Sequence, residues 1–356
     1  MNEDGKGITS VSLENFLAFQ GKFHADFCPG VNVFIGGNGS GKTTLLKVLH
    51  MALCSGGAQG ERILPPGETF FSSAERTLEE HFPDVSIARK IDSVGEDASL
   101  IELEDIGEQR DFRMYLSTAR RKRASASELT RVGGIQTTCF SIKGTVFIPT
   151  IDLLAATGQL LALDRKHILP FDITAMDILS DAALPISREI TPNAIKCLDK
   201  IKTIIGGTVE FLNDTFYTIK ANGDKIPFSL EASGYRKLGL LWKLLRNGLL
   251  ESGSVLFWDE PENSINPELI PHLVDILLTL QKGGVQIFIA THSYDIARWF
   301  ELNKTEENAL RYFNLRKTGT GIVADVADSY KALPHSVIRD AGNALLQRAS
   351  QVAAGK

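Results

Sequence analysis

Residues 36–43 are glycine-rich and have the residue types and spacing of a loop that holds phosphate. They fit the pattern G-x-x-x-x-G-K-[ST] at every fixed position, between an apolar stretch at 31–35 and a stretch with helical periodicity. Glycines let backbone N–H groups turn toward phosphates, and the N-terminal end of the following helix adds partial positive charge. Lys42 can then reach the β- and γ-phosphates, and the Thr43 hydroxyl can ligate Mg²⁺. A glycine-rich turn that binds nothing is the alternative. We expect ATP contacts from Gly36, Asn38, Gly39, Ser40, Gly41, Lys42, Thr43 and Thr44.

Two consecutive carboxylates, Asp259 and Glu260, end the apolar stretch 254–258. A buried strand ending here would deliver Asp259 to the coordination shell of Mg²⁺ and place Glu260 beside an attacking water. A second apolar stretch, residues 285–290, is followed closely by His292. A single histidine in such a place is usually structural, so its role depends on the motifs around it. We expect Lys42 and Glu260 to act in catalysis. We expect Thr43 and Asp259 to hold the metal.

The chain has 356 residues, 43% of them hydrophobic, so it can bury one large core or two modest ones. Its formal net charge is −5, and a contact with nucleic acid would therefore need a local basic patch. One run of four cations could meet a phosphate backbone, although such a run is more often a solvated face. The run consists of Arg120, Arg121, Lys122 and Arg123.

The four cysteines, Cys28, Cys54, Cys139 and Cys197, are far apart in the sequence and have no metal-ligand spacing. We expect ordinary reduced thiols. No charged-then-apolar leader opens the chain, and no run of about 18 apolar residues could span a bilayer. These features predict a cytoplasmic protein that makes no membrane contact of its own.

The rest of the pattern alternates between strands and helices and predicts an α/β fold. Strands are expected near residues 8–16, 22–27, 139–148, 209–211, 216–219, 310–315 and 321–327, and helices near 150–163, 175–183, 192–205, 238–245 and 332–354. We expect four parts: a first lobe at 1–149 that includes an antiparallel β subdomain, a helical insertion at 150–205, a second lobe at 206–331, and C-terminal helices at 332–356. The C-terminal helices carry an apolar face that either packs on its own domain or docks a partner.

The motifs, in their order along the chain, resemble the ABC-type ATPases of the SMC, Rad50, RecF and OLD group (AAA_15/AAA_21-like). Asn15-Phe16 follows the first strand as it does in that group, and residues 261–267 match the D-loop of the OLD-like members. Ser233-Gly234 occupies the place of the ABC signature, ahead of an apolar helix. The resemblance implies an ABC-type fold with a mixed central sheet, helices, an antiparallel β subdomain and a short helical insertion. The insertion has no sustained heptads, so no long coiled coil is expected.

The resemblance also implies roles for individual residues. Ser233 and Gly234 would bind the γ-phosphate of an ATP held by the opposite subunit, and His292 would contact the γ-phosphate from its own side. A hydroxyl, a glycine and a helix N-terminus make a sound anion site, although Ser233 alone would be taken for a helix N-cap. The glutamine of the Q-loop is left open between Gln136 and Gln159.

Three aromatic residues of the first hairpin are weak candidates for contact with adenine, because residues of this hairpin flank the base in the resembled group. They are Phe16, Phe19 and Phe23. Packing in the core of a small sheet is an equally good explanation for them.

The resemblance implies that two copies sandwich two ATP molecules head to tail, so that the protein is a homo-oligomer held together by ATP and Mg²⁺. We expect an ATPase that acts as a sensor or scaffold for a separately encoded effector, similar to the ATPase subunits of two-gene phage-defence systems such as PARIS and Septu. The alternative is a DNA-repair ATPase of RecF or Rad50 type that binds DNA across its dimer. A nucleotide-binding subunit of a transporter is the least favoured reading, because the signature is unorthodox and the Q-loop is unclear.

Overall fold

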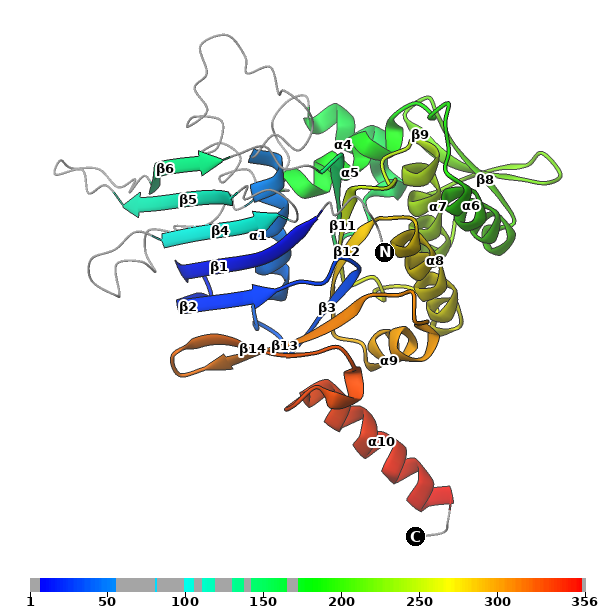
Figure 1. Ribbon diagram of the computed structural model, residues 1–356. Helices are drawn as coiled ribbons and strands as arrows, with labels where there is room; N and C mark the ends of the chain where they lie inside the picture. Colours follow the sequence, from blue (N-terminus) through cyan, green and yellow to red (C-terminus); the bar gives the residue numbers. More distant parts are fainter. Residues whose placement is uncertain are drawn as a thin grey trace.

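The structure is a computed structural model that describes residues 7–55, 81, 99–105, 111–118, 130–137, 142–164 and 172–353 (Figure 1). The strands are β1 (Ile8–Phe16), β2 (Phe19–Asp26), β3 (Val31–Ile35), β4 (Ser99–Asp105), β5 (Asp111–Thr118), β6 (Thr130–Thr137), β7 (Gly144–Ile148), β8 (Gly207–Leu212), β9 (Thr215–Lys220), β10 (Lys225–Pro227), β11 (Ser254–Asp259), β12 (Gln286–Thr291), β13 (Leu310–Thr318) and β14 (Gly321–Ala327). The α-helices are α1 (Lys42–Ser55), α4 (Thr157–Asp164), α5 (Ile173–Ala183), α6 (Pro192–Ile205), α7 (Ser233–Arg246), α8 (Ile270–Lys282), α9 (Tyr294–Asn303) and α10 (Val337–Ala353). Short 3-10 helices lie at Leu154–Ala156, Pro267–Leu269 and Tyr330–Ala332.

A six-stranded sheet with the order β14-β13-β3-β12-β11-β7 forms the centre of the molecule. The pairs from β13 to β7 are parallel, and β14 is antiparallel to β13. Every residue of β3, β11 and β12 is buried. Strands that are buried along their whole length are typical of a parallel sheet that is covered on both faces.

One face of the central sheet packs against α1, and α1 in turn packs against a five-stranded antiparallel sheet with the order β2-β1-β4-β5-β6. The side chains that alternate toward this face are large aromatics, among them Phe34, Phe257 and Phe288. Phe34 and Phe288 are stacked with ring centroids 6.3 Å apart, and Phe257 and Phe288 are stacked at 5.1 Å. The phosphate-binding helix is therefore held between two sheets.

The opposite face of the central sheet receives the alternate residues of the same strands, such as Val33, Leu256 and Ile289. It is covered by helices α5 to α9, which lie together on one side of the sheet in Figure 1. The predicted helical insertion occurs as α4, α5 and α6, followed by a small sheet of order β10-β9-β8. The predicted fold class is confirmed: the structure has a mixed central sheet, an antiparallel β subdomain and, within the described ranges, no long coiled coil.

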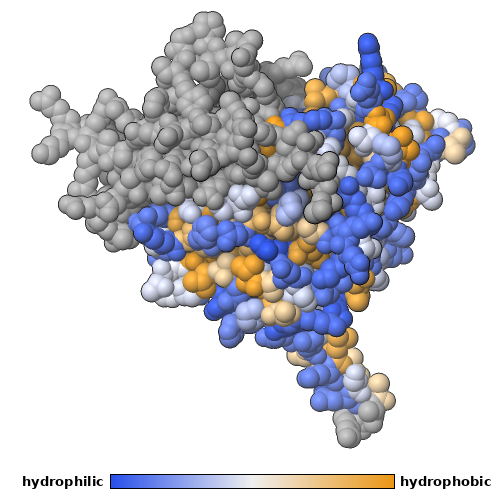
Figure 2. Space-filling view, viewed as in Figure 1, coloured by the Kyte–Doolittle hydropathy of each residue, from blue (hydrophilic) through white to orange (hydrophobic). Residues whose placement is uncertain are grey.

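The C-terminal helix α10 projects away from the body of the molecule (Figure 1). Its first half meets α9, where Ile338 is partly buried and the backbone at Gly342 passes close to the Tyr294 ring. Leu345 and Leu346 are 71% and 56% exposed, and Figure 2 shows hydrophobic residues along the projecting helix. The apolar face of α10 therefore packs on the body of the molecule at Ile338, whereas Leu345 and Leu346 farther along the helix do not.

Two further details differ from the expected elements. The strand expected over 139–148 is described only from Gly144 to Ile148, and the helix expected to open at 238 begins at Ser233. In the described part of the chain, no helix combines the length and the apolar character needed to cross a bilayer.

Candidate nucleotide-binding site

The phosphate-binding loop lies between β3 and α1 and presents an exposed backbone surface. Residues 37–39 and the Thr43 side chain are exposed, whereas Ser40 and Lys42 are buried. Gly41 has a φ of +88°, and a Cβ added there would lie 2.7 Å from Ile322 Cδ1, so the loop requires a glycine at this position. The exposed loop and the N-terminus of α1 provide the N–H groups and the partial positive charge that suit an anion.

Lys42 is held in place by the loop that it serves. Its Nζ donates to the carbonyl oxygens of Gly36 and Gly37 at 2.9 and 3.0 Å and lies 3.5 Å from His292 Nδ1. Burial lowers the pKa of Lys42 to about 8, against the opposing attraction of Asp259 and neighbouring carboxylates. Burial therefore disfavours the charged form of Lys42, and a bound phosphate would stabilise it.

Asp259 ends β11 with its carboxylate 5% exposed and faces two hydroxyl groups. Thr43 Oγ1 donates to Asp259 Oδ2 at 2.9 Å, and Thr150 Oγ1 donates to the same oxygen at 3.1 Å. Burial raises the pKa of Asp259, and the two hydroxyl hydrogen bonds oppose that shift. A carboxylate beside two hydroxyl oxygens is a hard oxygen donor set, which fits Mg²⁺.

Sequence reasoning missed Thr150, which follows β7 just after Pro149. Because β7 pairs in parallel with β11, the residue after β7 is brought to the same sheet edge as Asp259. A polar residue directly after a predicted strand was the available signal. Of the two Q-loop candidates, Gln159 is exposed on α4, and Gln136 lies on β6 at the edge of the antiparallel sheet. Thr150, which lies between β7 and α4, is the residue that reaches the Asp259 carboxylate.

Glu260 and His292 face each other across the ends of two neighbouring strands. His292 Nε2 lies 3.1 Å from Glu260 Oε1. Glu260 has a φ of +49°, a left-handed conformation that costs a residue with a Cβ about 1 kcal/mol. Its backbone N–H donates to Ala290 O at 2.8 Å, which fixes this conformation at the end of the sheet. The unusual backbone turns the Glu260 side chain toward His292.

A second carboxylate, Glu262, positions His292 and was not recognised from the sequence. Its Oε1 accepts from Thr291 Oγ1 at 2.6 Å and from the His292 backbone N–H at 2.9 Å. The two bonds fasten the segment after β11 to the end of β12. The available signal was a third acidic residue close behind the pair at the end of the strand, in the sequence Asp259-Glu260-Pro261-Glu262.

The signature segment lies at the N-terminus of α7. The helix begins at Ser233, and its N-cap is Ala232, which makes no side-chain capping bond. The N-cap alternative for Ser233 is therefore wrong: its Oγ instead donates to Ser264 O, 2.8 Å away in the D-loop. Gly234 is buried, and a Cβ added there would make ordinary contacts with Ile265 and Leu269, so its own chain does not require a glycine at this position.

Arg236 does not extend the anion site at the start of α7. Its Nε donates to Asp152 Oδ2 at 2.8 Å, and its Nη1 donates to Glu231 O at 2.6 Å. The guanidinium group is thereby occupied by Asp152 and by the backbone of Glu231, and it does not point at the anion site. Lys237 is 4% exposed, with Nζ 3.5 Å from Glu260 O, and burial lowers its pKa.

The structure brings together Lys42, Thr43, Asp259, Glu260 and His292, while Ser233 and Gly234 lie at a separate helix terminus. The proposed contact of the first-hairpin aromatics with adenine is contradicted, because Phe16 and Phe19 are fully buried and Phe23 is 4% exposed. They belong to the core beneath the antiparallel sheet. The cation run at 120–123 lies outside the described residues.

Comparisons with known proteins agree with this architecture. Residues 160–297 match a protein-family model described as "AAA domain, putative AbiEii toxin, Type IV TA system", and residues 10–139 match one described as "AAA domain". A stretch of 50 residues is 48% identical to the DNA replication and repair protein RecF of Heliobacterium modesticaldum, and it spans 14% of this chain and 13% of that protein.

Solved SMC heads are among the structures that match the chain. An SMC head bound to the C-terminal winged-helix domain of ScpA matches with a TM-score of 0.53 and 12% identity, over 91% of this chain and 98% of that one. The SMC head domain from Thermotoga maritima matches with a TM-score of 0.46 and 13% identity, over 89% and 97% of the two chains.

The fold is that of an SMC head, and two parts of the chain match models of AAA domains. These matches make the chain similar to the SMC/Rad50/RecF-like ABC-type ATPases.

Proposed function

We propose that the chain binds ATP with Mg²⁺ at the phosphate-binding loop and hydrolyses it. The observation that carries this proposal is the convergence of the Lys42 ammonium, the Thr43 and Asp259 oxygens, and the Glu260–His292 pair at one edge of the central sheet. The loop residues Gly36 to Thr44 would hold the phosphates, and Thr43 with Asp259 would hold the metal. When bound, Mg²⁺ would neutralise charge on the phosphate oxygens.

In this proposal Glu260 accepts a proton from the attacking water. Its carboxylate is 31% exposed and lies next to the phosphate loop, so water and nucleotide can both reach it. His292 contacts the γ-phosphate on the other side, with its backbone held by Glu262. A general base contributes about 10²–10⁴-fold to such a reaction.

Ser233 and Gly234 complete the site of a second copy. They lie at the N-terminus of α7, which has no acidic residue in its first turn and is therefore suited to an anion. Gly234 has room for a Cβ within its own chain, which supports a requirement for glycine that comes from a partner. The resulting homodimer would hold two ATP molecules head to tail, and its closed state would depend on ATP.

We further propose that this ATP-gated dimer is a sensor or scaffold for a separately encoded effector in anti-phage defence. The matched family description names a toxin of a toxin–antitoxin system, and the similar SMC head is described as bound to ScpA. The projecting α10 supplies the docking element, with Leu345, Leu346 and Val352 exposed on it. We propose that the occupant is an apolar groove of the effector, because the exposed residues recur at helical spacing.

The test of the ATPase is the Glu260→Gln variant. We expect its ATP turnover to fall by about 10²–10⁴-fold and its dimer to persist with ATP in native mass spectrometry. Adding Gly234→Asp should abolish the dimer, since a carboxylate at this helix terminus opposes the γ-phosphate. Unchanged turnover in Glu260→Gln would contradict the assignment of Glu260.

The scaffold role is tested by co-expression with the product of the neighbouring gene. Leu345→Ser together with Leu346→Ser should release a co-purifying effector, whereas Asn343→Ser, an exposed polar change on the same helix, should not. An ATP-bound dimer that co-purifies with DNA but with no effector protein would instead favour the alternative, a RecF-like repair ATPase. The observation that supports this second candidate function is the match to RecF over 50 residues.

A further inference from the structure

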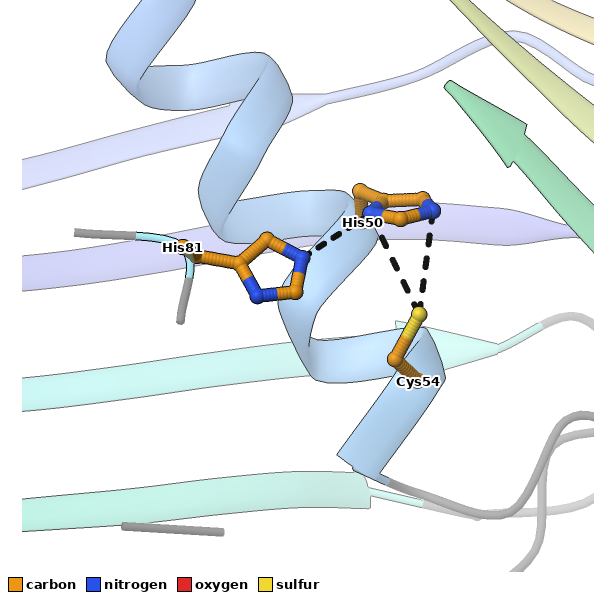
Figure 3. A group of neighbouring side chains, drawn as sticks. All are labelled: His50, Cys54 and His81. Carbon is orange, nitrogen blue, oxygen red and sulfur yellow. Dashed lines mark hydrogen bonds between the residues drawn. The ribbon is translucent and has the colours of Figure 1, made fainter. Parts of the chain in front are cut away.

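Three side chains that bind transition metals meet beside the last turns of α1 (Figure 3). His50 and Cys54 are four residues apart, so they lie on the same face of the helix. His81 reaches them from a segment 31 residues further along the chain than His50. The spacing of these residues in the sequence does not predict a three-ligand group, because the third ligand, His81, comes from outside the helix.

The distances between the possible ligand atoms fit one ion. His50 Nδ1 lies 3.0 Å from His81 Nε2, and Cys54 Sγ lies 3.9 Å from His50 Nδ1. One ligand atom from each residue can be chosen so that all three lie within 4.8 Å of one another. Around tetrahedral zinc, with Zn–N of about 2.0–2.1 Å and Zn–S of about 2.3 Å, such atoms are separated by roughly 3.3–3.6 Å. Small side-chain adjustments would bring the three atoms to this geometry.

The surroundings favour a metal over a charged imidazole. His50 is 3% and His81 2% exposed, and the His50 ring packs edge-on against Phe147 and Phe257. Neutral imidazoles in such a place are good zinc ligands, and the thiolate of Cys54 would be stabilised by the cation. Two nitrogens and one sulfur form a donor set suited to Zn²⁺ rather than to Mg²⁺ or Ca²⁺. A direct hydrogen bond between the two imidazoles is the competing explanation.

We propose that His50, Cys54 and His81 form a zinc-binding site that joins the end of α1 to the segment carrying His81. Cys54 is the member of the group that solvent reaches, and a water molecule can take the fourth tetrahedral position. The same helix begins at Lys42 in the phosphate-binding loop. Zinc would therefore anchor the far end of the helix that positions the nucleotide site.

The first test measures metal in the full-length protein. Protein purified without added metal and without nucleotide should contain about one zinc ion per chain, as measured by inductively coupled plasma mass spectrometry. Chelation should lower its Tm by several degrees, because zinc binding contributes directly to folding stability. Cobalt added to the chelated protein should give a sulfur-to-cobalt charge-transfer band and tetrahedral visible bands.

Matched variants locate the metal. Cys54→Ser should remove the charge-transfer band, and His81→Gln should lower the zinc content at least tenfold. The controls are Cys28→Ser, a buried thiol in another part of the core, and His272→Gln, an exposed imidazole on α8; both should keep the metal. Wild-type protein that binds neither zinc nor cobalt would overturn the proposal, as would full loading in Cys54→Ser and His81→Gln. The wild-type measurement decides the matter even if a variant fails to fold.

Discussion

Thr43 Oγ1 donates a hydrogen bond of 2.9 Å to Asp259 Oδ2, and this bond joins the first turn of α1 to the end of β11 across 216 residues of sequence. Both oxygens belong to the proposed magnesium site. Before any ion arrives, the buried Asp259 carboxylate is thus kept in place by hydroxyl groups. The site is organised in advance by bonds that Mg²⁺ would have to replace in part.

We predict that Asp259→Asn stabilises the free chain and disables the site. An amide keeps an acceptor for Thr43 and Thr150 but carries no charge, so the burial that raises the pKa of Asp259 no longer has a cost. Stability should rise by about 0.5–2 kcal/mol, as at other sites where function is kept at the expense of stability. Thermal unfolding with and without ATP and Mg²⁺ measures both effects. A lower Tm of the free variant, or a full ATP-dependent rise in its Tm, would contradict this account.

We predict that ATP affinity falls as the pH rises above 8. The phosphates bind the protonated form of Lys42, whose pKa in the free chain is about 8. ATP should raise that pKa, so binding above pH 8 takes up a proton and should weaken by up to about tenfold per pH unit. Titration calorimetry between pH 7 and 9.5 measures the effect. Lys42→Arg should bind more weakly but without this pH dependence, since a guanidinium stays protonated throughout.

Glu262 is predicted to act through His292. Glu262→Ala leaves the Thr291 hydroxyl and the His292 N–H without their shared acceptor, at a cost of about 1–3 kcal/mol in stability. Turnover should fall about 10–100-fold with little change in KM, because Glu262 positions His292 and does not hold the nucleotide. Glu262→Gln keeps the accepting oxygen and should restore most of the turnover. Equal losses in the alanine and glutamine variants would show that the charge matters instead.

Gly41 and Gly37 provide a matched pair within the loop. Gly41→Ala places a Cβ in a left-handed conformation and against Ile322, so it should destabilise the chain by about 1–3 kcal/mol and weaken ATP binding. Gly37→Ala meets nothing within 4 Å in the free chain, so its Tm should stay unchanged. Urea unfolding of the two variants measures the difference. Similar losses of stability at both positions would contradict the described course of the loop.

Asp181 on α5 should make the chain less stable as the pH rises. Burial, followed by the nearby charge of Asp177, raises the pKa of Asp181 to about 7. The folded state then holds a proton that the unfolded state releases near pH 4, so stability falls as the pH rises from about 4 to 7. Asp181→Asn should be more stable than wild type at pH 8 by about 1–2 kcal/mol and equal to it at pH 3.5. Parallel pH profiles of urea unfolding test this.

The sequence alone determined the fold class and most elements of the central sheet. Residues 33–35, 255–258 and 287–290 are apolar without interruption, and strands buried on both faces account for such short runs. The glycine pattern and the paired carboxylates are likewise recognisable without tertiary information, because each is defined by neighbours in the chain.

Tertiary structure decided everything that depends on contacts between distant segments. Thr150 meets Asp259 because β7 lies beside β11, and Glu262 holds His292 because two strand ends lie side by side. Phe19 proved to be core because the antiparallel sheet that carries it packs against α1. His81 joins His50 and Cys54 from another segment. Local patterns fix which backbone conformation a segment prefers, but the partners of a polar side chain are chosen by packing, which no single stretch of sequence encodes.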